Sequence, residues 1–402
     1  MSTSSAAVQS EAAPMPRSPR EFLRRFAQGE FGSLRVLITL AVIWIIFGLA
    51  HDRFLSAVNL TNLSLQIAGI GLISVGVVLV LLLGEIDLSV AIVSGLCAAI
   101  MAVLNVKHGW SPVLAVVVAV AAGAAIGTFQ GFVHTRFGIP SFVVTLAGLL
   151  GWQGALLWVL GDTGTVNINA AFIVDLAGTF FDDAVGWAIA IVLILVYAAV
   201  TLNGRRERIK AGLEAPPVGF LVIRIVAIAI PVVVTVWIVN QDRGLPLALC
   251  ILVGFVMLFD YITQRTRFGR HIYAVGGNEE AARRAGIRVG RIRIAVFALA
   301  STMAACGGIM LASRLLAVNQ SSGGSDLLLL SIAGPVIAGT SLFGGRGRVW
   351  SALLGALVIG SINNGMDLLA YSSDTKFMVT GAVLLGAVVV DAATSRRRQK
   401  AG

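Results

Sequence analysis

Long apolar runs, separated by short polar connections, recur along the chain from Leu34 to Asp391. Each run holds roughly 20 residues, the length at which an α-helix crosses the hydrocarbon core of a bilayer. The pattern predicts an all-α polytopic membrane protein with about 10–12 transmembrane helices. Twelve segments can be drawn, at residues 34–50, 63–83, 88–104, 112–133, 139–160, 184–202, 218–239, 246–262, 294–315, 326–343, 349–369 and 375–392.

Two places in this pattern predict broken or re-entrant helices, near residues 84–89 and 323–343. The first is a polar interruption, Gly84–Asp87, between two apolar runs, and segment 326–343 begins and ends in glycine-rich sequence. Both places put an acidic residue beside glycine at an apolar boundary. Because interrupted helices in matching positions of two halves often mark a transport site, an internal repeat is one interpretation.

The two ends of the chain differ from the transmembrane domain at residues 34–392. Residues 1–33 are rich in Ser, Ala, Pro and Arg and lack the apolar core of a secretory signal. We interpret them as a disordered cytoplasmic tail. Residues 393–402 are expected to form a basic cytoplasmic tail.

Charge gives the orientation of the helices. The chain is 57% hydrophobic and 12% charged, with a net charge of +10, whereas soluble domains are about 25% charged. The basic residues lie in short connections, which is typical of loops on the cytoplasmic side, so nucleic-acid binding is not favoured. The connection at 161–183 holds acidic residues but no Lys or Arg and is expected outside. If successive helices cross the membrane in alternating directions, both termini are cytoplasmic. The basic groups then fall on the same side: Arg17–Arg25, Arg205–Lys210, Arg346–Arg348, Arg396–Arg398 and the arginine-rich loop 263–293.

A polar stretch at residues 276–286 predicts a short docking helix. Asn278 suits the N-cap, and acidic residues follow in the first turn, where the helix dipole favours negative charge. Gly286 can close the helix in the left-handed conformation. So short a helix is marginal alone, which indicates a contact with a partner. The candidate contact residues are Gly277, Asn278, Glu279, Glu280, Ala281, Ala282 and Gly286.

The sequence lacks the motifs of an enzyme. There is no Gly-Lys dipeptide, so the phosphate-binding loop GxxxxGK[ST] is excluded. The four histidines are scattered, and Cys97, Cys250 and Cys306 form no CxxC pair. We therefore expect no catalytic residue, no metal site and no cofactor on this chain. If transport uses ATP, a separate chain must hydrolyse it.

Polar residues within the apolar runs are candidates for a translocation path. Glu85, Asp87 and Ser89 form one group, because a carboxylate inside a membrane is costly and usually functional. A helix end that caps backbone amides is the open alternative. Trp152 and Gln153 offer a planar surface beside an amide, although ordinary packing is the favoured interpretation of Trp152.

Asn363 and Asn364 form a second amide-rich place in an apolar run. Two adjacent amides in a membrane need partners, because unsatisfied polar groups there are costly. They could bind sugar hydroxyls or hold neighbouring helices together, and helix packing is the favoured interpretation.

Several motifs resemble one family. Glu280-Ala281-Ala282 followed by Gly286 is similar to the EAA-xxx-G pattern of the permeases of ABC importers. The wider sequence resembles the bacterial monosaccharide branch of that family. Two features, Glu85 and an extra region around 184–245, resemble the D-xylose type within that branch. The matching segments are GEIDLSV at 84–90, PSFVVTLAG at 140–148, FGRHIYAVGGN at 268–278, GTSLFGG at 339–345 and NNG at 363–365. Ala91 stands where the family's first motif ends in glycine, and this difference affects local helix packing.

The resemblance implies a non-catalytic, inner-membrane subunit that translocates a monosaccharide, with D-xylose the expected cargo. Ribose, galactose or a branched-chain amino acid is the alternative cargo, and a self-powered secondary transporter is the alternative mechanism. The implied partners are a second permease copy, a cytoplasmic ATP-binding subunit, an extracytoplasmic sugar-binding protein, the sugar and membrane lipid, with no nucleic acid. In that family the docking helix is the coupling helix that contacts the ATPase.

Overall fold

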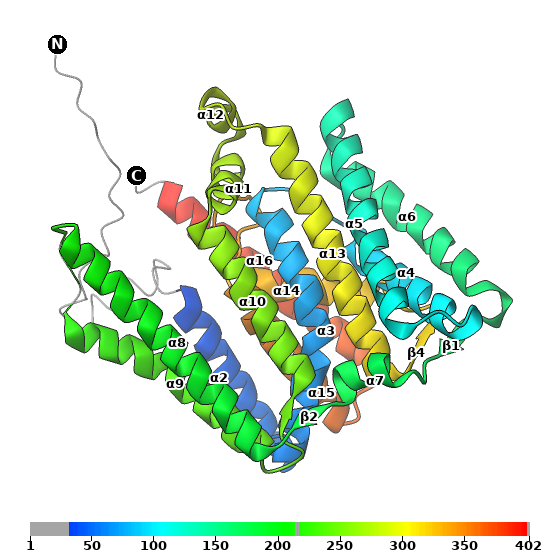
Figure 1. The fold of residues 1–402 in the computed structure, drawn as a ribbon, viewed down its shortest axis with the longest axis horizontal. Helices are drawn as coiled ribbons and strands as arrows, with labels where there is room; N and C mark the ends of the chain where they lie inside the picture. Colours follow the sequence, from blue (N-terminus) through cyan, green and yellow to red (C-terminus); the bar gives the residue numbers. More distant parts are fainter. Residues whose placement is uncertain (1–31, 214, 216, 400–402) are drawn as a thin grey trace.

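A computed structural model of the chain describes residues 32–213, 215 and 217–399. These residues form a bundle of helices (Figure 1). The helices are α2 Gly32–Ala50, α3 Ala57–Leu82, α4 Val90–Ala102 with a π-helical turn at Val103–Lys107, α5 Pro112–Phe137, α6 Ser141–Leu160 with a 3-10 turn at Gly161–Thr163, α7 Ala171–Gly178, α8 Asp183–Lys210, α9 Val218–Val239, α10 Leu247–Arg265, α11 Arg267–Gly277, α12 Glu279–Arg284, α13 Val289–Leu315, α14 Ser325–Ile337, α15 Trp350–Leu368 and α16 Ser373–Gln399.

The all-α polytopic fold is confirmed. Each of the twelve predicted segments corresponds to a helix, and eight helices in the described part of the chain are long and apolar enough to cross a membrane. α14 has 13 residues, or roughly 20 Å of helix, which is shorter than a hydrocarbon core of about 30 Å. It therefore cannot cross as a single full-length helix.

The core lies around α3 and α13. In its most apolar stretch α3 is 83% buried and α13 is 61% buried, whereas the value is 11% for both α8 and α9. α3 is surrounded by α13, α15, α10 and α14. α8 and α9 lie to one side beside α2, and α5 and α6 lie on the other side (Figure 1). The outer helices expose large apolar side chains such as Leu150, Trp158 and Ile223, as expected of surfaces that face lipid.

Glycine permits the close approach of the central helices. A side chain at Gly308 of α13 would place its Cβ 2.0 Å from the carbonyl oxygen of Ser94 on α4. A Cβ on Gly355 of α15 would lie 2.0 Å from the carbonyl carbon of Gly334 on α14. Membrane helices use small residues in this way because apolar burial does not drive them together in lipid.

α15 is also joined to α3 by buried amides. Asn364 is 3% exposed, and it exchanges hydrogen bonds of 2.7 and 3.1 Å with Asn59 near the start of α3. Asn363, beside it, is partly buried. These hydrogen bonds join two neighbouring helices, which is what the helix-packing interpretation expects of Asn364.

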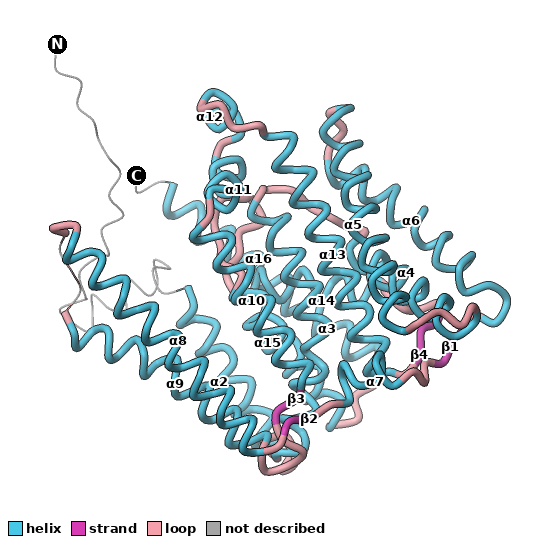
Figure 2. Tube along the Cα trace, in the orientation of Figure 1, coloured by secondary structure: helices cyan, strands magenta, loops and turns pink. Residues whose placement is uncertain are grey.

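Two small antiparallel sheets lie at the opposite end of the bundle from α12 (Figure 2). β1 Thr165–Asn167 pairs with β4 Ala317–Asn319, with Val166 opposite Val318. β2 Phe180–Phe181 pairs with β3 Leu245–Pro246. The hydrophobic pattern did not predict these strands or helices α7 and α11, because all are short and lie in connections.

The two predicted interruptions are present, with different bounds. Residues 83–89 between α3 and α4 are irregular, and Gly84 has a φ of 77°. Segment 326–343 was predicted too long, since α14 ends at Ile337. Gly339 follows with a φ of 97°, a conformation that ends a helix.

The predicted N-terminal tail lies almost entirely outside the described residues, whereas most of the predicted C-terminal tail lies within them. Residues 1–31 and 400–402 lie outside them, whereas Gly32 and Ser33 already belong to α2. α16 continues to Gln399 and so takes up most of the predicted basic tail at 393–402.

Candidate functional site

The short helix α12 has the caps that its sequence predicts. The side-chain oxygen of Asn278 accepts a hydrogen bond of 2.9 Å from the amide of Ala281, and Gly286 has a φ of 81°. Ala282 is buried against the bundle, whereas Ala281 is exposed. The Glu280 side chain is 64% exposed and pairs with Arg284. α12 therefore presents one face to the bundle and a charged face to its surroundings.

A cavity of about 340 Å³ lies beside α12. It combines apolar and basic groups at the surface where α12 is joined to α13. Its lining residues are His271, Ala285, Gly286, Ile287, Arg288, Arg291 and Ile292.

Three segments meet through their backbones beneath α12. The amide of Gly345 donates a 2.9 Å hydrogen bond to the carbonyl oxygen of Leu82, the last residue of α3. A Cβ on Gly276 of α11 would lie 1.9 Å from the same oxygen, and a Cβ on Gly344 would lie 2.8 Å from the Cα of Gly84. We call these contacts the glycine junction. It brings together three of the sequence motifs, at 84–90, 268–278 and 339–345.

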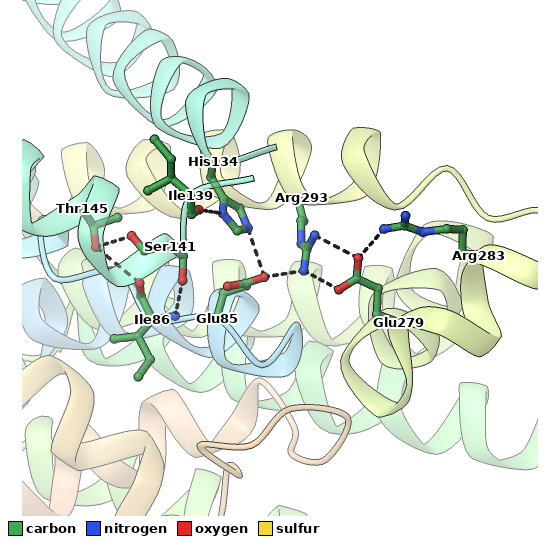
Figure 3. Close-up of polar contacts among 9 residues, drawn as sticks. All are labelled: Glu85, Ile86, His134, Ile139, Ser141, Thr145, Glu279, Arg283 and Arg293. Carbon is green, nitrogen blue, oxygen red and sulfur yellow. Dashed lines mark hydrogen bonds and ion pairs between the residues drawn. The ribbon is translucent and has the colours of Figure 1, made fainter. Parts of the chain in front are cut away.

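Glu85 lies at the centre of a charged cluster beside this junction (Figure 3). Its Oε1 atom lies 2.8 Å from Nη2 of Arg293 at the start of α13 and 3.1 Å from Nε2 of His134 near the end of α5. The Glu85 side chain is 12% exposed. Burial alone would raise its pKa, but the bond to His134 and the nearby Arg293 outweigh burial and hold the pKa of Glu85 below its usual value.

His134 is held from both sides. Its Nδ1 atom lies 2.6 Å from the carbonyl oxygen of Ile139, just beyond the left-handed Gly138 that ends α5, and its Nε2 atom faces Glu85. A carbonyl and a carboxylate can only accept hydrogen bonds, so both bonds together require the doubly protonated, cationic ring when Glu85 is ionised.

Arg293 joins Glu85 to α12 (Figure 3). Its Nη2 and Nη1 atoms lie 2.8 and 3.2 Å from the two carboxylate oxygens of Glu279, the first residue of α12. Such a two-point contact is among the stronger ion pairs in proteins. Arg283 donates a further hydrogen bond of 2.7 Å to Glu279. A continuous chain of charges therefore runs from α12 to His134.

Asp87 starts a second polar chain. It is 4% exposed, and its Oδ1 atom accepts hydrogen bonds of 2.8 and 2.7 Å from the amide and the hydroxyl of Ser89. The Ser89 hydroxyl also contacts Gln130 of α5, whose Nε2 donates to it at 2.9 Å. Burial raises the pKa of Asp87, against the effect of the bonds from Ser89. Its Oδ2 atom has no hydrogen-bond partner among the described residues.

The backbone between Glu85 and Ser89 is fixed by α6. The amide of Ile86 donates to the hydroxyl of Ser141 at 3.3 Å, and the amide of Leu88 donates to that of Thr145 at 3.1 Å. These bonds replace the helical ones that the irregular segment lacks. Its geometry is thus set by neighbouring helices.

Trp152 lies beside the second polar chain without a hydrogen bond to it, whereas Gln153, Asn363 and Asn364 have other neighbours. A Cβ on Gly148 would meet both Nε2 of Gln130 and Nε1 of Trp152, so the amide and the indole are neighbours, and this Nε1 is buried without a hydrogen-bond partner in the described part of the chain. Gln153 instead points toward the carbonyl of Gln320, at 3.5 Å. Asn363 and Asn364 lie near the opposite end of α3 from Glu85. Whether any of these residues contacts a substrate stays a prediction.

His134, Arg293 and Gln130 were missed as site residues. The predicted helices ended at 133 and began at 294, one residue short of His134 and Arg293, so both were assigned to loops. α5 and α13 in fact include them. Gln130 carried a usable signal, because an amide within an apolar run needs a partner.

Comparison with known proteins identifies the family. The model of the family described as "Branched-chain amino acid transport system / permease component" matches residues 59–388. The chain belongs to this permease family.

Individual relatives of the permease are consistent with this assignment. It is 37% identical to the xylose transport system permease protein XylH of Escherichia coli K12 over 344 residues, which cover 86% of this chain and 87% of the relative. It is 32% identical to XylH of Haemophilus influenzae, over 90% of this chain and 96% of the relative. It is 31% identical to the ribose import permease protein RbsC of Bacillus subtilis, over 90% of this chain and 94% of the relative. No solved structure matches the chain significantly.

These relatives confirm the resemblance to monosaccharide importer permeases. Proteins of this kind are transport components, so the chain is a transport subunit and not an enzyme. With its apolar helices it is a multi-pass membrane protein.

The glycine junction predicts the effect of one added methyl group. Gly276→Ala would force the Leu82 carbonyl away, because a backbone atom cannot rotate aside, and such overpacking costs about 1–3 kcal/mol. We expect the Tm of the purified permease in detergent to fall by about 1–4 °C, because the entropy of unfolding grows with chain length and a chain of 402 residues loses roughly 1 °C per kcal/mol. Gly277→Ala is the matched control, since a Cβ there meets no atom within 4 Å. Equal Tm values for the two variants would contradict the tight packing of this junction.

Proposed function

We propose that this chain is the membrane-spanning subunit of an ATP-driven importer that carries a monosaccharide, with D-xylose as its substrate. The observation that carries the proposal is the similarity to XylH over most of both chains. The capped helix α12, which presents a charged face at one end of the bundle, supports the same mechanism.

The choice of xylose rests on the order of similarity. The identity to XylH proteins is 32–37%, against 31% for the ribose permeases RbsC. Ribose is therefore the second candidate. Galactose, and the branched-chain amino acids in the description of the family, are further alternatives.

We assign ATP hydrolysis to a separate cytoplasmic subunit that docks on α12. The exposed residues of α12 and the adjoining cavity provide a surface with apolar and basic groups for this contact. A soluble sugar-binding protein would deliver substrate on the opposite side. A second copy of the permease would complete the pathway, and the chain would itself carry no cofactor.

This assignment fixes the orientation in the bacterial inner membrane. α12 and the arginine-rich region around it lie on the cytoplasmic side, in keeping with the usual excess of Arg in cytoplasmic loops. Both termini are then cytoplasmic, and the two small sheets face outward.

We place the substrate path beside Asp87, Ser89, Gln130 and Trp152. Oδ2 of Asp87 and Nε1 of Trp152 are buried polar atoms that lack a hydrogen-bond partner among the described residues. A sugar hydroxyl can donate to the first and accept from the second. Such a site can be weak, because the binding protein supplies selectivity.

Radiolabelled sugar uptake tests the function. A strain without its own pentose importers would express this gene together with its ATPase and binding-protein genes. We expect saturable xylose uptake that is lost when either the permease or the ATPase is omitted. Ribose, galactose and leucine are measured in parallel, and faster uptake of one of them would reassign the substrate. Uptake that survives without the ATPase but collapses with the proton gradient would indicate a secondary transporter instead.

The docking surface predicts the effect of charge reversal on α12. Glu280→Lys would place a third cation beside Arg283 and Arg284, while the lost surface ion pair is worth only about 0–1 kcal/mol to folding. We expect the permease to insert normally and the amount of co-purified ATPase to fall about tenfold. Glu207→Lys is the control, because Glu207 is similarly exposed and paired on α8. An unchanged amount of ATPase with Glu280→Lys would contradict docking at α12.

A further inference from the structure

We propose that Arg293 transmits the movement of α12 to the irregular segment 83–89 by holding Glu279 and Glu85 at the same time. This proposal rests on the proposed function, since it concerns how ATP-driven motion reaches the pathway. Arg293 is thereby a positioning residue, because it need not touch the substrate.

The geometry gives Arg293 two partners in separate segments. Its Nη2 atom lies 2.8 Å from Oε1 of Glu85 and 2.8 Å from Oε2 of Glu279. Glu279 begins α12, whereas Glu85 lies in the irregular segment just before α4. One guanidinium therefore joins the docking helix to the broken part of the transmembrane domain (Figure 3).

Burial makes this link strong enough to carry a displacement. The side chains of Arg293 and Glu85 are only 18% and 12% exposed, and Glu279 is 37% exposed. Ion pairs this shielded are screened less by salt than surface pairs. Separating them would leave partly buried charges without compensation, so α12 and Glu85 move together at lower cost than apart.

The segment that would be moved connects directly to the proposed path. Asp87 lies two residues beyond Glu85 and is bonded through Ser89 to Gln130. The amides of residues 83–85 bond to carbonyl oxygens in the last turn of α3, whereas those of Ile86 and Leu88 bond to side-chain hydroxyls of α6. Residues 86–88 can exchange these single bonds more easily than a helix can unwind. A shift of Glu85 would thus displace Asp87.

The surface pairs of α12 do not provide this route. Arg284 binds Glu280 within the same helix, with both side chains mostly exposed. Arg283 contacts Glu279, also within α12. These pairs stabilise the docking helix itself, whereas Arg293 extends the contact to another part of the chain.

The test uses the complete importer reconstituted in proteoliposomes, with uptake and ATP hydrolysis measured on the same vesicles. Arg293→Ala is expected to assemble with the ATPase in normal amount but to transport about tenfold less sugar per ATP hydrolysed. Glu85→Gln, which keeps the shape and removes the charge, should show the same defect. Arg293→Lys should be intermediate, because an ammonium lacks the planar fork that serves two carboxylates.

Arg208→Ala is the control, since Arg208 is exposed on α8, lies outside the docking surface and contacts neither carboxylate. It should retain the wild-type ratio of sugar to ATP. A wild-type ratio in both Arg293→Ala and Glu85→Gln would overturn the proposal. If Arg293→Ala fails to insert, Glu85→Gln decides alone. Absence of ATP-dependent uptake in the wild-type importer would instead refute the proposed function.

Discussion

The glycine junction is the constraint on which the α12 end of this permease depends. Leu82, Gly276 and Gly345 meet through backbone atoms, with a hydrogen bond of 2.9 Å between Gly345 and Leu82. Because no side chain separates them, the ends of α3 and α11 and the loop after α14 are held at fixed spacing. α12 follows α11 directly, so the junction brings the start of α12 near the irregular segment 83–89, where Arg293 contacts both.

The charged cluster adds ion pairs to the backbone contacts of the glycine junction. Two carboxylates, Glu85 and Glu279, lie on either side of one guanidinium, and Nε2 of His134 also contacts Glu85. Burying such groups is costly unless each is paired, which explains why the cluster is continuous. Asp87 differs, because it has no ion-pair partner among the described residues, and its Oδ2 atom has no hydrogen-bond partner there. The structure thus separates an ion-paired cluster from a buried carboxylate with one oxygen that no described residue binds.

The hydrophobic pattern predicts most of the fold because lipid imposes it. A span must be apolar for about 20 residues and must satisfy its own backbone, so all twelve segments became helices. The caps of α12 were also predictable, since Asn278 and Gly286 act on neighbouring residues. The charged cluster was not, because its partners are distant in sequence and a one-residue error in helix bounds hid His134 and Arg293. The strands β1 and β4 were missed for a related reason, as their pairing joins residues 165–167 to 317–319.

The most direct measurement follows the movement of the 83–89 segment itself. Ile86, which is 38% exposed, can be replaced by cysteine and spin-labelled after Cys97, Cys250 and Cys306 are changed to alanine. With the ATPase bound in nanodiscs, a non-hydrolysable ATP analogue should change the electron paramagnetic resonance spectrum of this label. Adding Arg293→Ala should abolish that change while the ATPase still binds. The same spectral change with and without Arg293 would contradict a link through this residue.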